Sequence, residues 1–136
     1  MTRKNSNRLL WTAQTLTAAL FLFAGSTKFM IPPEQLTQGP IALPLAFMYF
    51  IGIAEVLGGL GLVLPGLFKV QTWLTPLAAA GLTIIMIGAV SVTVAGMGVF
   101  AGTFPAVVGI VTTWIAYART RVAPIADSHR AILRAA

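Results

Sequence analysis

The sequence predicts an all-α integral membrane protein with four transmembrane helices in a compact antiparallel bundle. The first observation behind this prediction is composition: of the 136 residues, 57% are hydrophobic and only 9% are charged. A soluble domain carries about 25% charged residues, so this chain has too few to cover a surface in contact with water. The second observation is that nearly all the charges lie between or beyond long apolar segments, where a membrane protein meets water.

Four apolar segments are long enough to cross a hydrocarbon core of about 30 Å as helices. The uncharged stretch from Val70 to Ala118 is too long for one span, and its glycine-rich part at 95–105 supplies the break between two helices. We expect a basic N-terminus at 1–8, a transmembrane domain at 9–118 and a basic tail at 119–136. Within the domain the expected spans are about 9–29, 43–64, 72–94 and 100–118.

The first apolar segment could also be a signal peptide, because the basic stretch MTRKNSNR precedes it. A signal peptide has an apolar core of about 7–15 residues and a small-residue cleavage site, whereas this segment is longer and lacks such a site. We therefore expect a retained helix. Three prolines in the stretch 30–40 predict a loop after it, and the second helix is expected to stop at Pro65 and Gly66.

The distribution of basic residues predicts the orientation in the membrane. Of the nine lysines and arginines, all but Lys28 lie in the two termini or in the loop after the second span. By the positive-inside rule, both termini are then cytoplasmic. Aromatic residues favour the membrane surface, and four of them are expected near this inner interface: Trp11, Trp73, Trp114 and Tyr117.

Several kinds of chemistry can be excluded. The net charge of +6 does not indicate a nucleic-acid-binding protein, because the basic residues lie at the ends of apolar segments rather than in one patch. The chain has no cysteine, which excludes thiol exchange and thiolate metal sites by this chain alone. Its single histidine, His129, lies in the basic tail, so no buried histidine pair can hold a haem. We expect no metal site, and the residues themselves identify no cofactor.

Lys28 and Glu55 are the only ionisable residues expected at depth in the membrane. A lone charge there costs about 2.5–3.5 kcal/mol, so such residues usually face the bundle interior and find a partner. Lys28 lies near the outer end of the first span, and Glu55 lies within the second. Helical side chains lean toward the N-terminus of their own helix, so these two lean toward each other. We predict a shared polar site that binds a ligand or exchanges a proton.

Each member of this pair also has a plainer explanation. Lys28 could be an interfacial lysine whose ammonium reaches water, and Glu55 could be a structural carboxylic acid bonded to a neighbouring helix. Burial favours the neutral acid and a nearby ammonium favours the carboxylate, so the sequence leaves the charge state of Glu55 open. The polar residues of the first span, Gln14 among them, are interpreted as helix packing.

Small residues near the pair predict close helix contact, because helices in lipid pack best where small side chains let their backbones approach. The glycines that we place near the site are Gly25, Gly52, Gly58 and Gly59. Their simplest role is packing, and a ligand-shaped notch beside Glu55 is the alternative.

Three short segments carry a family resemblance: FLFAGSTKF at 21–29, YFIGIAEVLGGLGLVLPG at 49–66 and MIGAV at 86–90. They resemble the DoxX-like family of small four-helix membrane proteins, whose motif positions match Lys28, Gly52, Glu55, Gly58 and Gly59. The resemblance implies a bacterial inner (plasma) membrane. Named members are membrane subunits linked to terminal quinol oxidase and to thiosulfate:quinone oxidoreductase, which implies a quinone as a possible ligand. Other members of the wider group act in membrane-protein assembly or enzyme maturation.

Three functions follow from these observations. The leading hypothesis is an accessory or binding subunit whose Lys28 and Glu55 engage a quinone-like head group or a redox partner. The alternatives are a proton-coupled small-molecule transporter built around Glu55 and a structural or assembly subunit. No catalytic residue can be named, so we expect no enzyme activity from the chain by itself, although it could be a subunit of a quinone-linked oxidoreductase. Its expected partners are the lipid bilayer and either an oxidoreductase subunit or a second copy of the chain.

Overall fold

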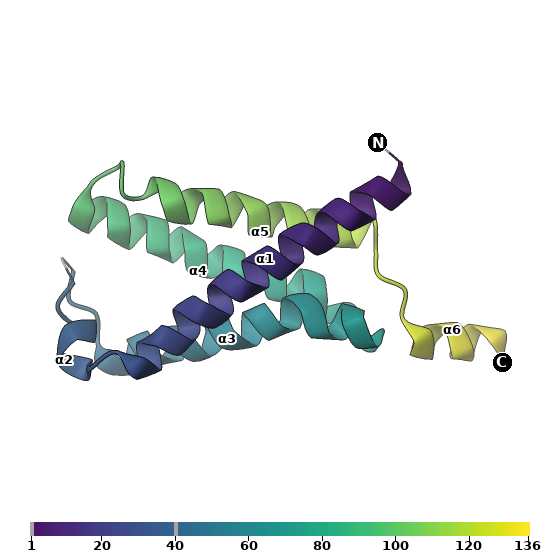
Figure 1. The fold of residues 1–136 in the computed structure, drawn as a ribbon, viewed down its shortest axis with the longest axis horizontal. Coiled ribbons are helices and arrows are strands. Elements are labelled where there is room, and N and C mark those ends of the chain that lie inside the picture. The colour runs from purple at the N-terminus through teal and green to yellow at the C-terminus, as the bar shows by residue number, and fades with distance from the viewer. Residues whose placement is uncertain (1, 40) are drawn as a thin grey trace.

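The computed structural model describes residues 2–39 and 41–136, so Met1 and Pro40 lie outside it, as do the side chains of His129 and Arg130. The described chain forms four long helices and two short ones (Figure 1). Their bounds are α1 Arg3–Met30, α2 Pro33–Leu36, α3 Leu45–Phe68, α4 Leu74–Met97, α5 Thr103–Arg121 and α6 Ser128–Ala135.

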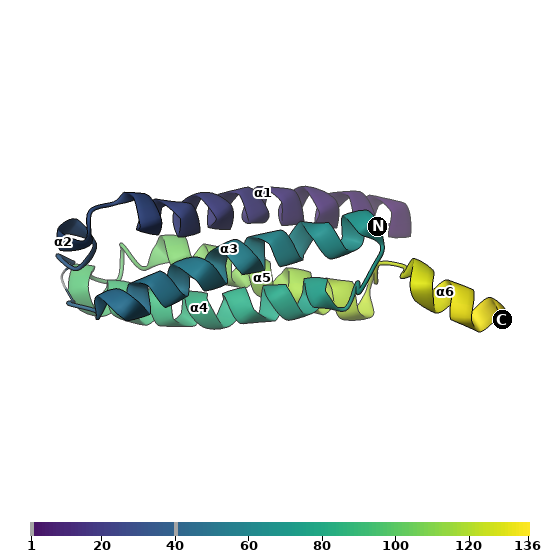
Figure 2. The same cartoon turned by 90° about the horizontal axis from the view of Figure 1, so that it is seen from below.

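The four long helices pack as an antiparallel bundle, and both ends of the chain lie at the same end of it (Figure 1). α3 packs against both α1 and α4, and α4 packs against α5. α1 crosses the bundle diagonally: it lies beside α5 near its own N-terminus and diverges from α5 toward its C-terminus (Figure 1). Figure 2 shows α4 and α5 on the side of the bundle opposite α1, whereas α3 crosses obliquely from the level of α4 to that of α1. The predicted all-α bundle of four main helices is confirmed.

Three of the long helices, α1, α3 and α4, are long and apolar enough to cross a membrane. Large apolar side chains cover their outward faces, and Phe23, Phe50 and Ile84 are 72%, 65% and 70% exposed. An apolar surface of this extent would be unfavourable in water, so these helices imply a lipid bilayer. α5 has 19 residues and carries two arginines in its last turn, and its crossing of the membrane stays a prediction.

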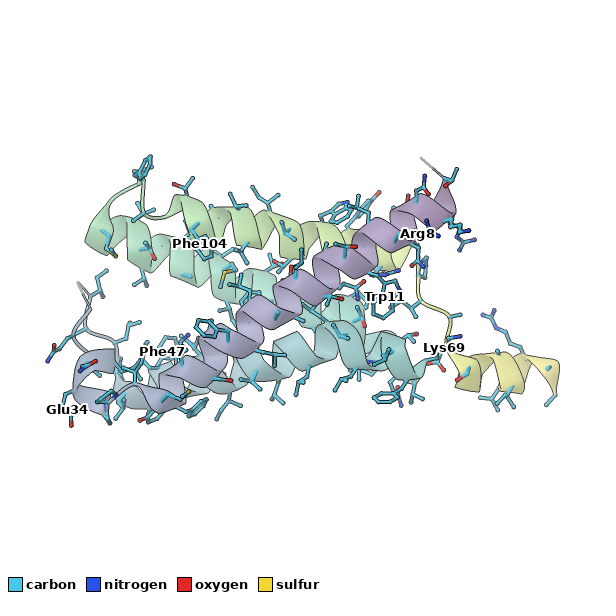
Figure 3. The ribbon with its side chains drawn as sticks, viewed as in Figure 1. Arg8, Trp11, Glu34, Phe47, Lys69 and Phe104 are labelled. Carbon is cyan, nitrogen blue, oxygen red and sulfur yellow. The ribbon has the colours of Figure 1, made fainter. Side chains whose placement is uncertain are left out.

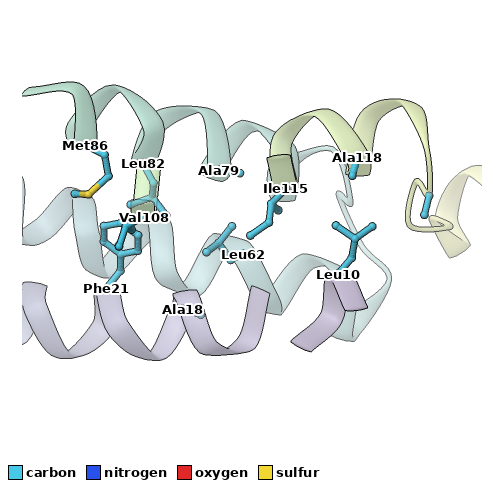
Figure 4. Close-up of a cluster of buried hydrophobic side chains, with 11 residues drawn as sticks. Leu10, Ala18, Phe21, Leu62, Ala79, Leu82, Met86, Val108, Ile115 and Ala118 are labelled. Atoms are coloured by element: carbon cyan, nitrogen blue, oxygen red, sulfur yellow. The ribbon is translucent and has the colours of Figure 1, made fainter. Parts of the chain in front are cut away.

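A narrow core of buried apolar side chains runs along the centre of the bundle (Figure 4). Every long helix contributes to it: Phe21 of α1, Leu62 of α3, Leu82 of α4 and Ile115 of α5 are all 2% exposed or less. In a membrane these contacts stabilise the bundle mainly through close packing. An apolar side chain that moves from lipid into the bundle interior was not in contact with water before, so the hydrophobic effect contributes little.

The helix α3 does not stop at Pro65 and Gly66, where the sequence predicted its end. It continues to Phe68 and ends at Lys69, whose φ of 55° is left-handed and whose N–H donates to the carbonyl oxygen of Pro65. A left-handed residue commonly closes a helix in this way. Proline removes one backbone donor but does not force the chain out of the helix in a membrane, where packing supports the neighbouring turns.

Candidate functional site

The structure joins Lys28 and Glu55 in an ion pair within the bundle. Lys28 lies in the last turn of α1, and its Nζ donates a hydrogen bond to Oε2 of Glu55 on α3 at 2.6 Å. The same ammonium donates to the carbonyl oxygen of Ala24 at 3.3 Å. The lysine side chain is 17% exposed and that of the glutamate 6%, so most of the pair is shielded. The prediction that these residues pair is confirmed.

Two glycines allow α1 and α3 to approach closely beside the ion pair. A Cβ on Gly25 would lie 2.7 Å from the carbonyl oxygen of Gly52, and a Cβ on Gly52 would lie 3.2 Å from that of Gly25. The helices therefore touch through backbone atoms here, which is the contact that small residues permit. Because the backbones are so near, the two charged side chains reach each other across one helix interface.

The other two glycines singled out in the sequence serve two different interfaces of α3. Gly59 faces α1, where a Cβ would lie 3.1 Å from the carbonyl oxygen of Ala18. Gly58 faces α4, where a Cβ would lie 2.6 Å from Cδ2 of Leu82. α3 thus presents small residues to both of the long helices that it packs against, α1 and α4.

An aromatic stack continues the α1–α3 contact beyond the ion pair. The rings of Phe29 and Tyr49 lie 5.5 Å apart with only 8° between their planes. Phe29 directly follows Lys28 in α1, and Tyr49 lies in the second turn of α3. The stack adds a contact of about 0.5–1.5 kcal/mol to this end of the interface.

A cavity of about 350 Å³ opens on the side of Glu55 that faces α4 and α5. It lies where α1 and α5 diverge, and Phe104 on its α5 side is near the end of the bundle opposite the termini (Figures 1 and 3). Among the described residues that line it, Glu55 is the only ionisable one and Thr93 of α4 is the only one with a hydroxyl group. An apolar cavity with a single carboxyl at its wall is the kind of concave site that orients a small ligand by one polar group.

The two carboxyl oxygens of Glu55 differ in their hydrogen bonds. Oε2 accepts the hydrogen bond from Lys28, whereas Oε1 accepts none from the described residues. A carboxylate can accept several hydrogen bonds, so Oε1 keeps capacity for a donor from outside the chain. Among the described residues, no three histidine, aspartate or glutamate side chains come close enough together to hold a metal ion.

A second polar cluster joins α1 to α5 at the other end of the bundle. Arg119 is 3% exposed, and its Nε donates to Oε1 of Gln14 at 2.5 Å. Its Nη1 donates to Oδ1 of Asn7 at 2.7 Å and to the carbonyl oxygen of Ala123 at 2.9 Å. The guanidinium also lies over the ring of Trp11, with 5.4 Å from Cζ to the ring centroid. This cluster holds the N-terminal half of α1 in place.

Sequence reasoning missed this cluster because it assigned Arg119 to the basic tail. The spacing of α5 carried a signal: Thr112, Ile115 and Arg119 repeat at intervals of three and four residues, and all three are buried. Gln14 was interpreted as helix packing, and it does hold helices together, since its Nε2 also donates to the carbonyl oxygen of Leu62 at 2.6 Å. It therefore connects α1 with both α3 and α5.

Replacing Gly25 with alanine should destabilise the bundle by about 1–3 kcal/mol, because the new methyl group collides with the backbone of Gly52 and must push the helices apart. The measurement is chemical or thermal unfolding of the purified protein in detergent. The matched control is Gly88→Ala on α4, where a Cβ meets no atom within 4 Å. That substitution should leave stability unchanged or raise it slightly. Equal effects of the two substitutions would contradict the close contact.

The sequence model of the DoxX-like family matches residues 12–116, which include all four glycines and both members of the ion pair. No curated protein and no solved structure matches the chain.

Proposed function

Because the chain belongs to the DoxX-like family, we propose that it is a small accessory or binding protein of the inner membrane that holds the head group of a lipid-soluble ligand. The observation that carries this proposal is the cavity of about 350 Å³ beside Glu55, whose wall is apolar apart from that carboxyl and the hydroxyl of Thr93. A quinol, the reduced form of a quinone, is the ligand that we favour.

The hydrogen-bonding state of Glu55 supports a ligand that donates. Lys28 holds Oε2 at 2.6 Å, and the remaining oxygen has only acceptor capacity while the group is ionised. A quinol hydroxyl can donate to that oxygen, whereas a quinone carbonyl cannot. Lys28 itself does not line the cavity, so its part is to fix the carboxylate in position rather than to touch the ligand.

The proposed orientation keeps the termini in the cytoplasm. Both ends of the chain lie at one end of the bundle, and Lys69 lies at that end as well (Figure 3). Positive charge is retained on the cytoplasmic side of a membrane, which supports this assignment. The cavity would then lie in the half of the membrane farther from the cytoplasm, near the end of α1 that carries Lys28.

The proposal is tested by ligand-dependent thermal unfolding in detergent. A soluble short-chain quinol present at 100 times its dissociation constant should stabilise the protein by about 2.7 kcal/mol. Glu55→Ala should abolish this shift, whereas Glu34→Ala, which removes an exposed carboxylate of α2, should keep it. Ala89→Leu supplies a second variant, because it fills the cavity wall and leaves the ion pair intact. If Glu55→Ala and Ala89→Leu both kept the shift in melting temperature, the proposal would be contradicted.

A structural role is the second candidate, and the backbone contact between Gly25 and Gly52 favours it. In this case the ion pair only fastens α1 to α3, so that the protein supports the assembly of others. Such a protein would show lower stability in Glu55→Ala, but neither quinol nor quinone would shift the melting of the wild type.

A further inference from the structure

A second pocket lies at the end of the bundle that carries both termini, far from Glu55. Its volume is about 480 Å³, and it is enclosed by the first turns of α1, the end of α3 and the segment 123–126 that links α5 to α6. Trp11 and Lys69, which both line it, lie at this end beside the linking segment (Figure 3). The function proposed for the ion pair makes no use of this pocket.

Specific contacts build the pocket. Ser128, at the start of α6, donates from both its N–H and its hydroxyl to the carbonyl oxygen of Lys69, at 3.0 Å each, and so holds the linking segment across the end of α3. A Cβ on Gly66 would lie 2.7 Å from Cδ1 of Ile125 and 2.9 Å from Cη2 of Trp11. Because Gly66 has no side chain, Ile125 and Trp11 can both pack against it, and together they form the apolar floor of the pocket.

The side of the pocket that faces water is cationic. Arg3, Lys4 and Lys69 all line it and are all exposed, and none of the described residues that line it carries a carboxylate. Asp127 lies just beyond the linking segment, and its Oδ2 accepts a hydrogen bond from the N–H of Thr72 on the α3–α4 connection. Three like charges around one concave surface raise the local concentration of anions.

Arg119 is a fourth cation, and it lies behind the residues that line the pocket. Three of the groups that hold Arg119 also line the pocket: Asn7, Trp11 and Ala123. Arg119 forms no ion pair with a carboxylate among the described residues, and its Nη2 is buried without a hydrogen-bond partner there. A buried guanidinium without a counter-charge is costly, so an anion nearby would stabilise it.

We propose that this pocket binds the phosphate group of an anionic ligand. The cations can neutralise a phosphate, and the apolar floor of Trp11 and Ile125 suits a hydrocarbon part attached to it. At the membrane surface, an anionic phospholipid has this combination, because its charged head group is attached to hydrocarbon chains. A soluble phosphate offers the same charge without the chain. This inference does not depend on the function proposed for Glu55.

The experiment uses the full-length protein in an uncharged detergent, with native mass spectrometry and thermal unfolding as readouts. Phosphatidylglycerol is titrated in one arm, phosphatidylcholine in a second and inorganic phosphate at constant ionic strength in a third. We expect phosphatidylglycerol to remain bound and to raise the melting temperature, with little effect of the zwitterionic phosphatidylcholine. Each cation near an anionic surface contributes about 1 kcal/mol, so Lys4→Gln/Lys69→Gln should weaken the apparent affinity about 30-fold.

The matched control is Arg121→Gln/Arg134→Gln, which removes the same charge from exposed positions outside the pocket. It should bind as tightly as the wild type. If inorganic phosphate alone reproduces the stabilisation and the pocket variant loses it, the site holds a soluble anion, and the phosphate-binding proposal still stands. Equal weakening in the pocket and control variants would overturn the proposal, because binding would then follow net charge. If the double variant does not fold, the single variant Lys69→Gln is used in its place. Its apparent affinity for phosphatidylglycerol is expected to be about fivefold weaker than that of the wild type.

Discussion

Lys28→Met is expected to lower the free energy of unfolding by about 3–5 kcal/mol, the cost of removing one partner from a buried ion pair. The substitution leaves the carboxylate of Glu55, whose side chain is 6% exposed, without the ammonium that lies 2.6 Å away in the wild type. Methionine has nearly the length of lysine and keeps its apolar contacts, so the loss reports the missing charge rather than a missing stem. The measurement is equilibrium unfolding in detergent micelles or bicelles.

The control for this result is a double-mutant cycle with Glu55→Met. If the two residues interact as the structure has it, the double variant should be more stable than Lys28→Met alone, because it contains no unpaired charge. Arg134→Met, which removes an exposed cation of α6 that lies outside both proposed sites, should have little effect. Additive losses from the two single substitutions would show that the residues do not interact.

Arg119→Leu is expected to destabilise the protein by about 3 kcal/mol. The substitution removes three hydrogen bonds from a charged donor, each worth about 1.5–3 kcal/mol, and gains back part of that loss through apolar packing. Gln14 and Asn7 lose the donor that they share, and the cation–π contact with Trp11 disappears. Unfolding experiments should show the loss, and hydrogen exchange should show greater opening at the N-terminal half of α1.

Arg121→Leu is the matched control, since Arg121 lies in the same last turn of α5 but is exposed. It should change stability by less than about 0.5 kcal/mol, as surface substitutions generally do. A comparable loss from both substitutions would mean that the positive charge at the end of α5 matters rather than the hydrogen bonds of Arg119.

The fold and the ion pair could be predicted because charges are so scarce in this chain. Long apolar segments separated by loops leave few alternatives to a helical bundle. Within the apolar segments there is one cation, Lys28, and one anion, Glu55. A buried charge in lipid usually pairs with an opposite charge, so each of these residues is the expected partner of the other. The direction in which helical side chains lean then decided that they could reach each other.

Other features depend on contacts that the sequence does not display. Arg119 directly follows an apolar segment, and from the sequence an arginine in that position could be either buried or at the membrane surface. It is buried because Gln14, on another helix, accepts its hydrogen bond, and the sequence does not reveal that contact. The start of α1 at Arg3 depends on the cap from Thr2, whose hydroxyl accepts from the N–H of Asn5. The cavity beside Glu55 depends on the angle at which α1 crosses the bundle, which no local pattern encodes.

The separation of Lys28 from Glu55 along the chain has a consequence for biosynthesis. The lysine of α1 is made 27 residues before the glutamate with which it pairs, so the first helix leaves the ribosome carrying a charge that has no counter-charge yet. Its stable position in the lipid therefore depends on the arrival of α3. Insertion of α1 and α3 together, as a hairpin connected through the short helix α2, would bring Glu55 beside Lys28 before the lysine has to stay in the hydrocarbon without a counter-charge.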